Sequence, residues 1–152
     1  MAKKQSAGLL LYRRGKDLEV FLVHPGGPFW AKKDLGAWSI PKGEFSESED
    51  PLATAQRELT EETGFSVNGA FRALQPVKQS GGKIVYAWAV EADCDPQKII
   101  SNTFALEWPP KSGRVQTFPE VDRAAWFSIS EAREKINSGQ AVLLDQLCTA
   151  LA

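Results

Sequence analysis

The sequence has few cysteines and no long apolar run. Its two cysteines, Cys94 and Cys148, stand far apart and form no C-x-x-C motif. We therefore expect two free thiols in a reducing cytoplasm. No apolar stretch approaches the length that crosses a membrane, so we expect no membrane partner. Residues 1–6 are followed by only a short apolar run before Arg13 and Arg14, which is not the pattern of a signal peptide.

The sequence also has no large excess of positive or of negative residues. The formal net charge is −1, and no block of like charge interrupts the chain. A dedicated nucleic-acid binder usually shows a basic bias, so we expect no long nucleic acid as a partner. Apolar residues make up 43% and charged residues 24%, which is ordinary for a soluble globular protein. A length of 152 residues predicts one domain over residues 1–152.

Hydrophobic patterning predicts several strands and two C-terminal helices. Gly81 and Gly82 supply a turn between two of the strands. The region 97–120 is the least regular, and its prolines exclude regular structure over residues 109–114. In the last helix we expect Val142 to share the buried side with three leucines. The expected strands are 6–13, 18–24, an irregular 66–77, 83–90, 101–108 and 124–129, and the expected helices are 130–136 and 141–151.

A further helix is predicted directly after Asp50. Asp50 suits the N-cap, and Pro51 suits the first helical position, where its missing N–H costs nothing. Gly64 stands where a left-handed C-terminal residue is wanted. Between these ends, Leu52, Ala55 and Leu59 fall on one side at helical spacing, and we expect that side to be buried.

Beside this apolar side lie three glutamates, Glu58, Glu61 and Glu62, at spacing i, i+3 and i+4. This spacing places three carboxylates close together on one face. Their repulsion favours a positive neighbour, which either Arg57 or a hard divalent cation supplies. For this triplet alone, a solvated acidic helix face is an equally simple interpretation.

The wider pattern is much more specific. It resembles the signature box of the Nudix hydrolase family, and every defined position of that box is filled. These positions are Gly43, Glu49, Arg57, Glu58, Leu59, Glu61, Glu62, Gly64 and Phe65. The resemblance implies an α/β/α sandwich with a mixed sheet, which the order of strands and helices also favours. It further implies metal-dependent hydrolysis of a diphosphate linkage in a nucleoside diphosphate derivative.

The resemblance also implies the metal site. Mg²⁺ or Mn²⁺ is the expected cofactor, and the choice of general base among the glutamates stays open. Arg57 is expected to orient the carboxylates, and Glu49 to help it. Glu120 stands six residues before Trp126, as an additional ligand or base does in many family members; a plain loop glutamate is the alternative. The expected ligands are Glu58, Glu61, Glu62, Glu120 and the backbone carbonyl of Lys42.

Several residues are candidates for substrate contact. Lys42 is well placed to meet a phosphate. Trp30 and the lysines that follow it suggest a lip that stacks on a base, although a loop with tucked aromatics is equally consistent. Lys111 and Arg114 lie in the 109–114 loop, which either closes over a polyphosphate or is simply solvated. The lone His24 is expected to be structural or exposed rather than catalytic.

Within the family, the run from Trp38 to Glu44 is most similar to the diadenosine tetraphosphate hydrolase branch. We therefore expect a small-molecule nucleotide substrate, either a dinucleoside polyphosphate or a nucleoside triphosphate. Oxidised nucleotides, nucleotide sugars and capped RNA 5′ ends are the other candidates. Two alternatives differ in kind: a regulatory module that binds a nucleotide without cleaving it, and an isomerase that would need Cys94. The sequence does not determine the oligomeric state.

Overall fold

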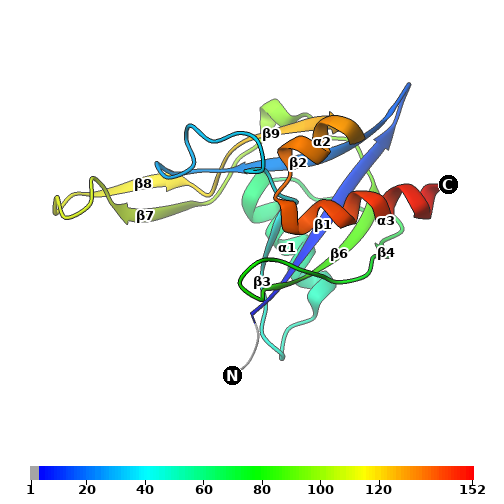
Figure 1. Cartoon of the computed structure of the whole chain (residues 1–152). Helices are drawn as coiled ribbons and strands as arrows, with labels where there is room; N and C mark the ends of the chain where they lie inside the picture. The colour runs from blue at the N-terminus through cyan, green and yellow to red at the C-terminus, as the bar shows by residue number, and fades with distance from the viewer. Residues whose placement is uncertain (1–3) are drawn as a thin grey trace.

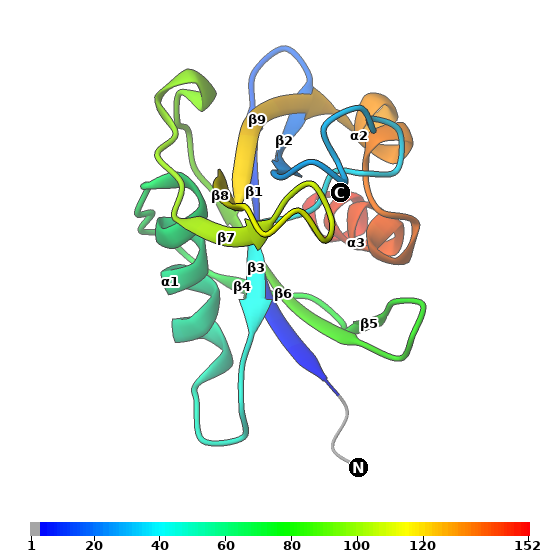
Figure 2. The ribbon, with the colours of Figure 1, turned by 90° about the vertical axis from the view of Figure 1, so that its left-hand side faces the viewer.

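The computed structural model describes residues 4–152, so the first three residues of the N-terminal segment lie outside the described part. The chain forms three layers. A mixed sheet lies in the middle, with one helix on one face and two on the other (Figures 1 and 2). This arrangement confirms the expected α/β/α sandwich. Within residues 4–152, no helix is both long and apolar enough to span a bilayer.

The central sheet is built around β1. This strand pairs antiparallel with β2 and β3 and parallel with β6, while β2 also pairs antiparallel with β9. The order is β4-β6-β1-β2-β9, with β3 beside β1 and β5 beside β6. The strands are β1 (Gln5–Arg14), β2 (Leu18–Pro25), β3 (Lys42–Glu44), β4 (Arg72–Ala73), β5 (Val77–Lys78), β6 (Ile84–Glu91) and β9 (Val121–Ser128).

Four predicted strands match β1, β2, β6 and β9 closely, and the irregular segment 66–77 contains only the short strands β4 and β5. The expected strand 101–108 is confirmed, whereas a strand at residues 115–119 was not predicted. Residues 103–107 and 115–119 form β7 (Thr103–Glu107) and β8 (Val115–Pro119), which pair as a two-stranded hairpin. The prolines around residue 109 belong to the hairpin turn, so they do not interrupt either strand.

This hairpin, which we call the arm, projects from the rest of the molecule (Figure 1). Its base packs on the loop after β2. The ring of Phe104 lies 2.8 Å from the position of a Cβ on Gly27, and the rings of Phe29 and Trp108 meet edge to face at 5.2 Å. The arm and this loop therefore support each other through aromatic contacts.

Three helices cover the sheet: α1 (Pro51–Thr63), α2 (Ile129–Lys135) and α3 (Ala141–Leu151). Helix α2 begins one residue earlier than predicted because Ser128 caps it by accepting a hydrogen bond from the Glu131 backbone N–H. The prediction for Val142 was wrong, since its side chain is 53% exposed while Leu144 is fully buried. On a helix, position 144 lies closer than 142 to the face that Leu143 and Leu147 share.

The sheet buries a separate hydrophobic cluster on each face. On one face Ala55 and Leu59 of α1 pack against Leu9, Leu11 and other residues of the strands. On the opposite face α2 and α3 cover a larger cluster that includes Trp38 and Phe127. His24 is fully buried against Trp38, which agrees with the expected structural role.

Candidate active site

Local sequence signals explain where α1 begins and ends. The Asp50 carboxylate accepts a hydrogen bond from the Ala53 backbone N–H at 2.9 Å. Gly64 adopts the left-handed conformation, with φ of 80°, and donates its N–H to the carbonyl of Thr60 at 2.7 Å. These caps fix the two ends of the helix. Because Ala55 and Leu59 face the sheet, the glutamates beside them lie at the edge of the helix–sheet interface.

Arg57 connects the acidic side chains of this segment. Its guanidinium lies 3.2 Å from Glu49 and 3.7 Å from each of Glu58 and Glu61. Glu49 in turn accepts hydrogen bonds from the backbone N–H and the hydroxyl of Ser46. The loop before α1 is therefore tied to the carboxylates through one guanidinium.

Strand β3 lies directly against α1, and its residues leave no free space there. A Cβ on Gly43 would stand 2.0 Å from Cδ of Glu58, so only glycine lets that side chain cross the strand. The neighbouring Lys42 donates its backbone N–H to Oε1 of Glu62 at 3.3 Å. Both glutamates are thus held against the backbone of β3.

Glu120 reaches α1 from the start of β9. The Asn102 backbone links the two segments, because its N–H donates to the Glu61 carbonyl and its carbonyl accepts from the Glu120 N–H, both at 2.8 Å. The Glu120 carbonyl also accepts from Gly26 N–H at 2.9 Å. The base of the arm therefore holds Glu120 next to the C-terminal half of α1.

These segments surround a cavity of about 140 Å³, which we call the carboxylate cavity. Glu62, Glu120 and Lys42 are the charged residues of its lining. Its walls also contain Val23, Pro25, Ser39, Ile40 and Val121. The fold thus brings together one residue from α1, one from β3 and one from the junction of β8 and β9.

Three carboxylates of the site, those of Glu58, Glu62 and Glu120, resist ionisation. Burial, followed by the neighbouring charge of Glu58, raises the pKa of Glu62 to about 8, even though Lys42 opposes the shift. The pKa of Glu58 is raised by burial and by Glu61, and the pKa of Glu120 is raised by the same two causes. For Lys42, burial and the charge of Lys83 lower the pKa. Acids gathered in this way ionise readily only beside an added positive charge.

This donor set fits a hard divalent cation, because carboxylate oxygens are the ligands that Mg²⁺ and Mn²⁺ prefer. Within residues 4–152, no three acidic, histidine or cysteine side chains are close enough together to form a ready-made metal centre. Of the four glutamates, Glu62 and Glu120 line the cavity, while Glu58 and Glu61 do not.

Other sequence candidates lie outside the carboxylate cavity. Trp30 is 39% exposed in the loop after β2, where the Lys33 ammonium lies 4.9 Å from the centre of its ring. Lys111 and Arg114 lie in the turn at the tip of the arm, which points away from α1 (Figure 1). Their contact with substrate remains a prediction.

Sequence reasoning missed Gln140, which is fully buried. Its side-chain carbonyl accepts a hydrogen bond from the Ile40 backbone N–H at 3.0 Å, and its amide donates to the hydroxyl of Ser39 at 3.0 Å. Gln140 therefore holds two residues of the cavity wall. No sequence motif marks it, because its partners stand about a hundred positions earlier in the chain.

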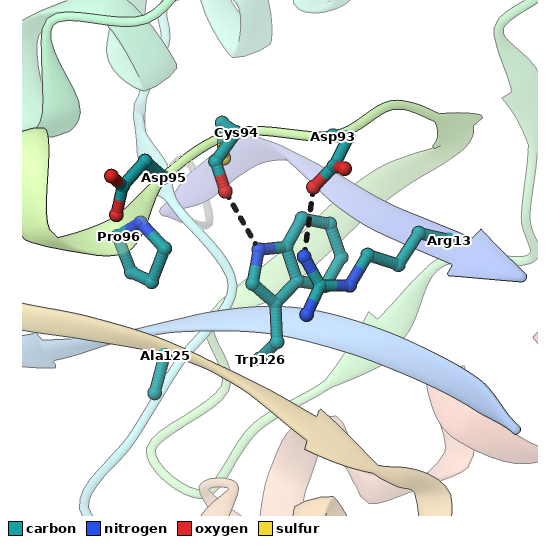
Figure 3. A pocket seen from close by; sticks show the side chains of 7 residues that line it. All are labelled: Arg13, Asp93, Cys94, Asp95, Pro96, Ala125 and Trp126. Carbon is teal, nitrogen blue, oxygen red and sulfur yellow. Dashed lines mark hydrogen bonds and ion pairs between the residues drawn. The ribbon is translucent and has the colours of Figure 1, made fainter. Parts of the chain in front are cut away.

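A larger surface cavity, of about 660 Å³, contains none of the box residues (Figure 3). Arg13 lies there over the ring of Trp126, at 4.3 Å from its centre, and donates to Asp93 at 2.8 Å. Burial, followed by the charge of Asp93, raises the pKa of the Cys94 thiol to about 11. A thiol that stays protonated at neutral pH is a poor nucleophile, which argues against the isomerase alternative.

Structural comparison finds the same fold in solved proteins. The NUDIX domain of Shewanella oneidensis NrtR, solved with ADP ribose, has a TM-score of 0.67 at 18% identity, covering 100% of this chain and 90% of that one. An Ap4A hydrolase of C. elegans has a TM-score of 0.63 at 22% identity, covering 97% of each chain. Identities this low support the fold alone.

Sequence comparison adds a partial match and a family. A Myxococcus xanthus octanoyltransferase is 30% identical over 101 residues, which are 66% of this chain and 25% of that protein. The matched region therefore spans a quarter of the length of that relative. The family model of the NUDIX domain, in contrast, matches residues 2–147. With the complete box and the sandwich fold, this match shows that the chain belongs to the Nudix family.

Proposed function

We propose that this protein is a metal-dependent hydrolase that cleaves a pyrophosphate linkage in a nucleoside diphosphate derivative. One observation carries the proposal. Glu62 of α1 and Glu120 of the β8–β9 junction meet in one cavity beside Lys42, and the pKa of Glu62 is raised to about 8 there. Such a site is suited to a divalent cation that binds an anionic substrate. Without a cation, carboxylates alone would repel the phosphates of that substrate.

Each residue has a distinct part in this proposal. Glu58, Glu61, Glu62 and Glu120 would hold Mg²⁺ or Mn²⁺, together with the backbone carbonyl of Lys42. When bound, the cation neutralises phosphate oxygens and lowers the pKa of the attacking water.

Lys42 also lines the cavity, and in this proposal its ammonium contacts a phosphate oxygen of the bound substrate. Arg57 keeps Glu58 and Glu61 in position through its ion pairs.

For the substrate, we propose a dinucleoside polyphosphate or a nucleoside triphosphate. The support is the run from Trp38 to Glu44 and the similarity of fold to an Ap4A hydrolase. The similarity to a NUDIX domain solved with ADP ribose favours a second candidate, a module that binds a nucleotide without hydrolysing it.

The two functions are separated by a hydrolysis screen with Mg²⁺ or Mn²⁺. The panel contains dinucleoside tetraphosphate, nucleoside triphosphates, nucleotide sugars and ADP-ribose. Because Glu62 lies in the cavity, Glu62→Gln should lower turnover by roughly a hundredfold or more while the protein stays folded. Glu47→Gln is the matched control, since Glu47 is exposed in the loop before α1.

Selective cleavage of the dinucleoside tetraphosphate would support the proposed substrate. Turnover of another nucleotide would keep the chemistry and reject that substrate. Saturable binding of a nucleotide without any turnover, unchanged in Glu62→Gln, would reject the hydrolase and favour the binding module.

A further inference from the structure

A second charged cavity lies on the face of the sheet opposite α1. It has a volume of about 550 Å³, and we call it the basic cavity. Its hydrophobic floor includes Trp38 and Phe127, which belong to the cluster under α2 and α3. The lining comprises Ala31, Lys32, Lys33, Asp34, Trp38, Arg123, Ala125, Phe127 and Lys135. None of these residues lines the carboxylate cavity.

The charges of this cavity do not balance. It has four cationic side chains and one carboxylate, that of Asp34. Lys135 forms an ion pair with Asp34, which also accepts a hydrogen bond from the Trp38 indole at 2.8 Å. Lys32, Lys33 and Arg123 form no ion pair within residues 4–152. An excess of about three positive charges thus faces one hollow.

Three of the four cationic side chains lie close to aromatic rings. The Arg123 guanidinium lies 5.3 Å from the ring centre of Trp38, and the Lys33 ammonium lies 4.9 Å from that of Trp30. Lys135 stands 6.0 Å from Phe127. Such contacts reduce the freedom of long side chains, so less entropy is lost when an anion binds.

The loop that carries the lysines is also held in place. Its Lys33 carbonyl lies 2.6 Å from Nε2 of the buried His24, and the Gly36 N–H donates to the Glu134 carbonyl at 3.0 Å. Nδ1 of the same histidine lies 2.8 Å from Asp122 of β9. The loop lysines and Arg123 are therefore positioned through one buried side chain that contacts both segments.

We propose that the basic cavity binds the linked phosphate groups of a soluble small molecule, at a site separate from the carboxylate cavity. Two or three linked phosphates carry the charge that matches the unpaired cations. Arg123 can present its planar fork of donors to phosphate oxygens, while the lysines add point charges. This binding needs no divalent cation and does not depend on the proposed hydrolysis.

The test is an NMR titration of the full chain with inorganic triphosphate in the presence of EDTA. The Trp38 indole N–H reports on the basic cavity because it donates to Asp34. The Trp126 indole, which donates to the Cys94 carbonyl at 2.9 Å, is the reporter for the other face of the sheet. We expect a saturable shift of the Trp38 signal and none of the Trp126 signal.

Two variants should weaken the binding by about tenfold each, the loss expected for one strong charged contact: Arg123→Gln and the double variant Lys32→Gln/Lys33→Gln. Arg123→Lys should weaken it less. Lys16→Gln/Lys98→Gln removes the same charge from exposed sites elsewhere and should leave the affinity unchanged. Well-dispersed spectra of every variant show that it is folded.

Three results would overturn the proposal. One is a Trp38 signal that does not shift with triphosphate, and another is an equal loss of affinity in the control double variant. The third is retention on vesicles of phosphatidylcholine with phosphatidic acid without binding of free triphosphate, which would identify a lipid surface as the ligand.

Discussion

Gly43 shows how one missing side chain shapes the site. The side chain of Glu58 crosses β3 at this residue, where a Cβ would stand 2.0 Å from its Cδ. The conflict involves the end of a flexible side chain, so the protein can relieve it by moving Glu58. The result of a larger residue should therefore be a displaced carboxylate and not a broken core.

We predict that Gly43→Ala lowers kcat/KM on the hydrolysed nucleotide by roughly ten- to a hundredfold, since displacement of a catalytic group by about 1 Å has costs of this order. The melting temperature should change little. Steady-state kinetics and thermal unfolding check the two halves of the prediction. Gly15→Ala is the control, because its Cβ would meet nothing within 4 Å. Full activity of Gly43→Ala would show that the position of Glu58 is unimportant.

At the scale of the element, α1 combines strong end signals with a buried side. Its caps are local, since Asp50 and Gly64 bond to residues within one turn. Its rotation is then set by Ala55 and Leu59 against the sheet. A helix of this kind should depend measurably on its N-cap, because the first N–H groups have no partner inside the helix.

We predict that Asp50→Ala lowers the free energy of unfolding by about 1 kcal/mol, the usual contribution of such a cap. Asp50→Asn should retain most of the stability, since asparagine also accepts the hydrogen bond. Urea denaturation followed by circular dichroism measures both. If the asparagine variant were as unstable as the alanine variant, the charge of Asp50 and not its cap would be responsible.

At the scale of the whole molecule, the two faces of the sheet carry sites of opposite charge. Acids gather on the α1 face, and unpaired cations gather on the α2–α3 face beside the edge strand β9. The acids shape the pH dependence of global stability. Because the pKa of Glu62 is about 8 in the folded chain, compared with an ordinary 4.5, the folded state keeps a proton that the unfolded state releases between these values.

We predict that the metal-free protein loses stability as the pH rises from about 5 to 8, on the order of a few kcal/mol. The raised pKa values of Glu58 and Glu120 act in the same direction. Glu62→Gln should have a smaller slope, and Glu47→Gln should behave like the wild type. Denaturation in EDTA at several pH values measures the slopes.

Mg²⁺ should raise the melting temperature more at pH 8 than at pH 6, because protons compete for the same carboxylates. An unchanged slope in Glu62→Gln would show that this residue does not titrate in the folded chain.

Much of the fold was readable from local patterns. The hairpin of β1 and β2, the strands β6 and β9, and the length of α3 all follow from alternation or helical spacing and from the turns beside them. Of the arm, β7 was predicted and β8 was missed, because a proline-rich turn separates the two strands. Val142 was misplaced because a helix with many apolar residues offers more than one apolar side, and only packing chooses between them.

By itself the sequence determined α1, its caps, the face that carries Glu58, Glu61 and Glu62, and the family, because these depend on residues close together in the chain. Only the tertiary structure decided which distant residues join them. Backbone hydrogen bonds through Asn102 bring Glu120 to α1. Strand pairing puts Arg123 beside the loop lysines. Such contacts come from strand register and packing, which no spacing along the chain encodes.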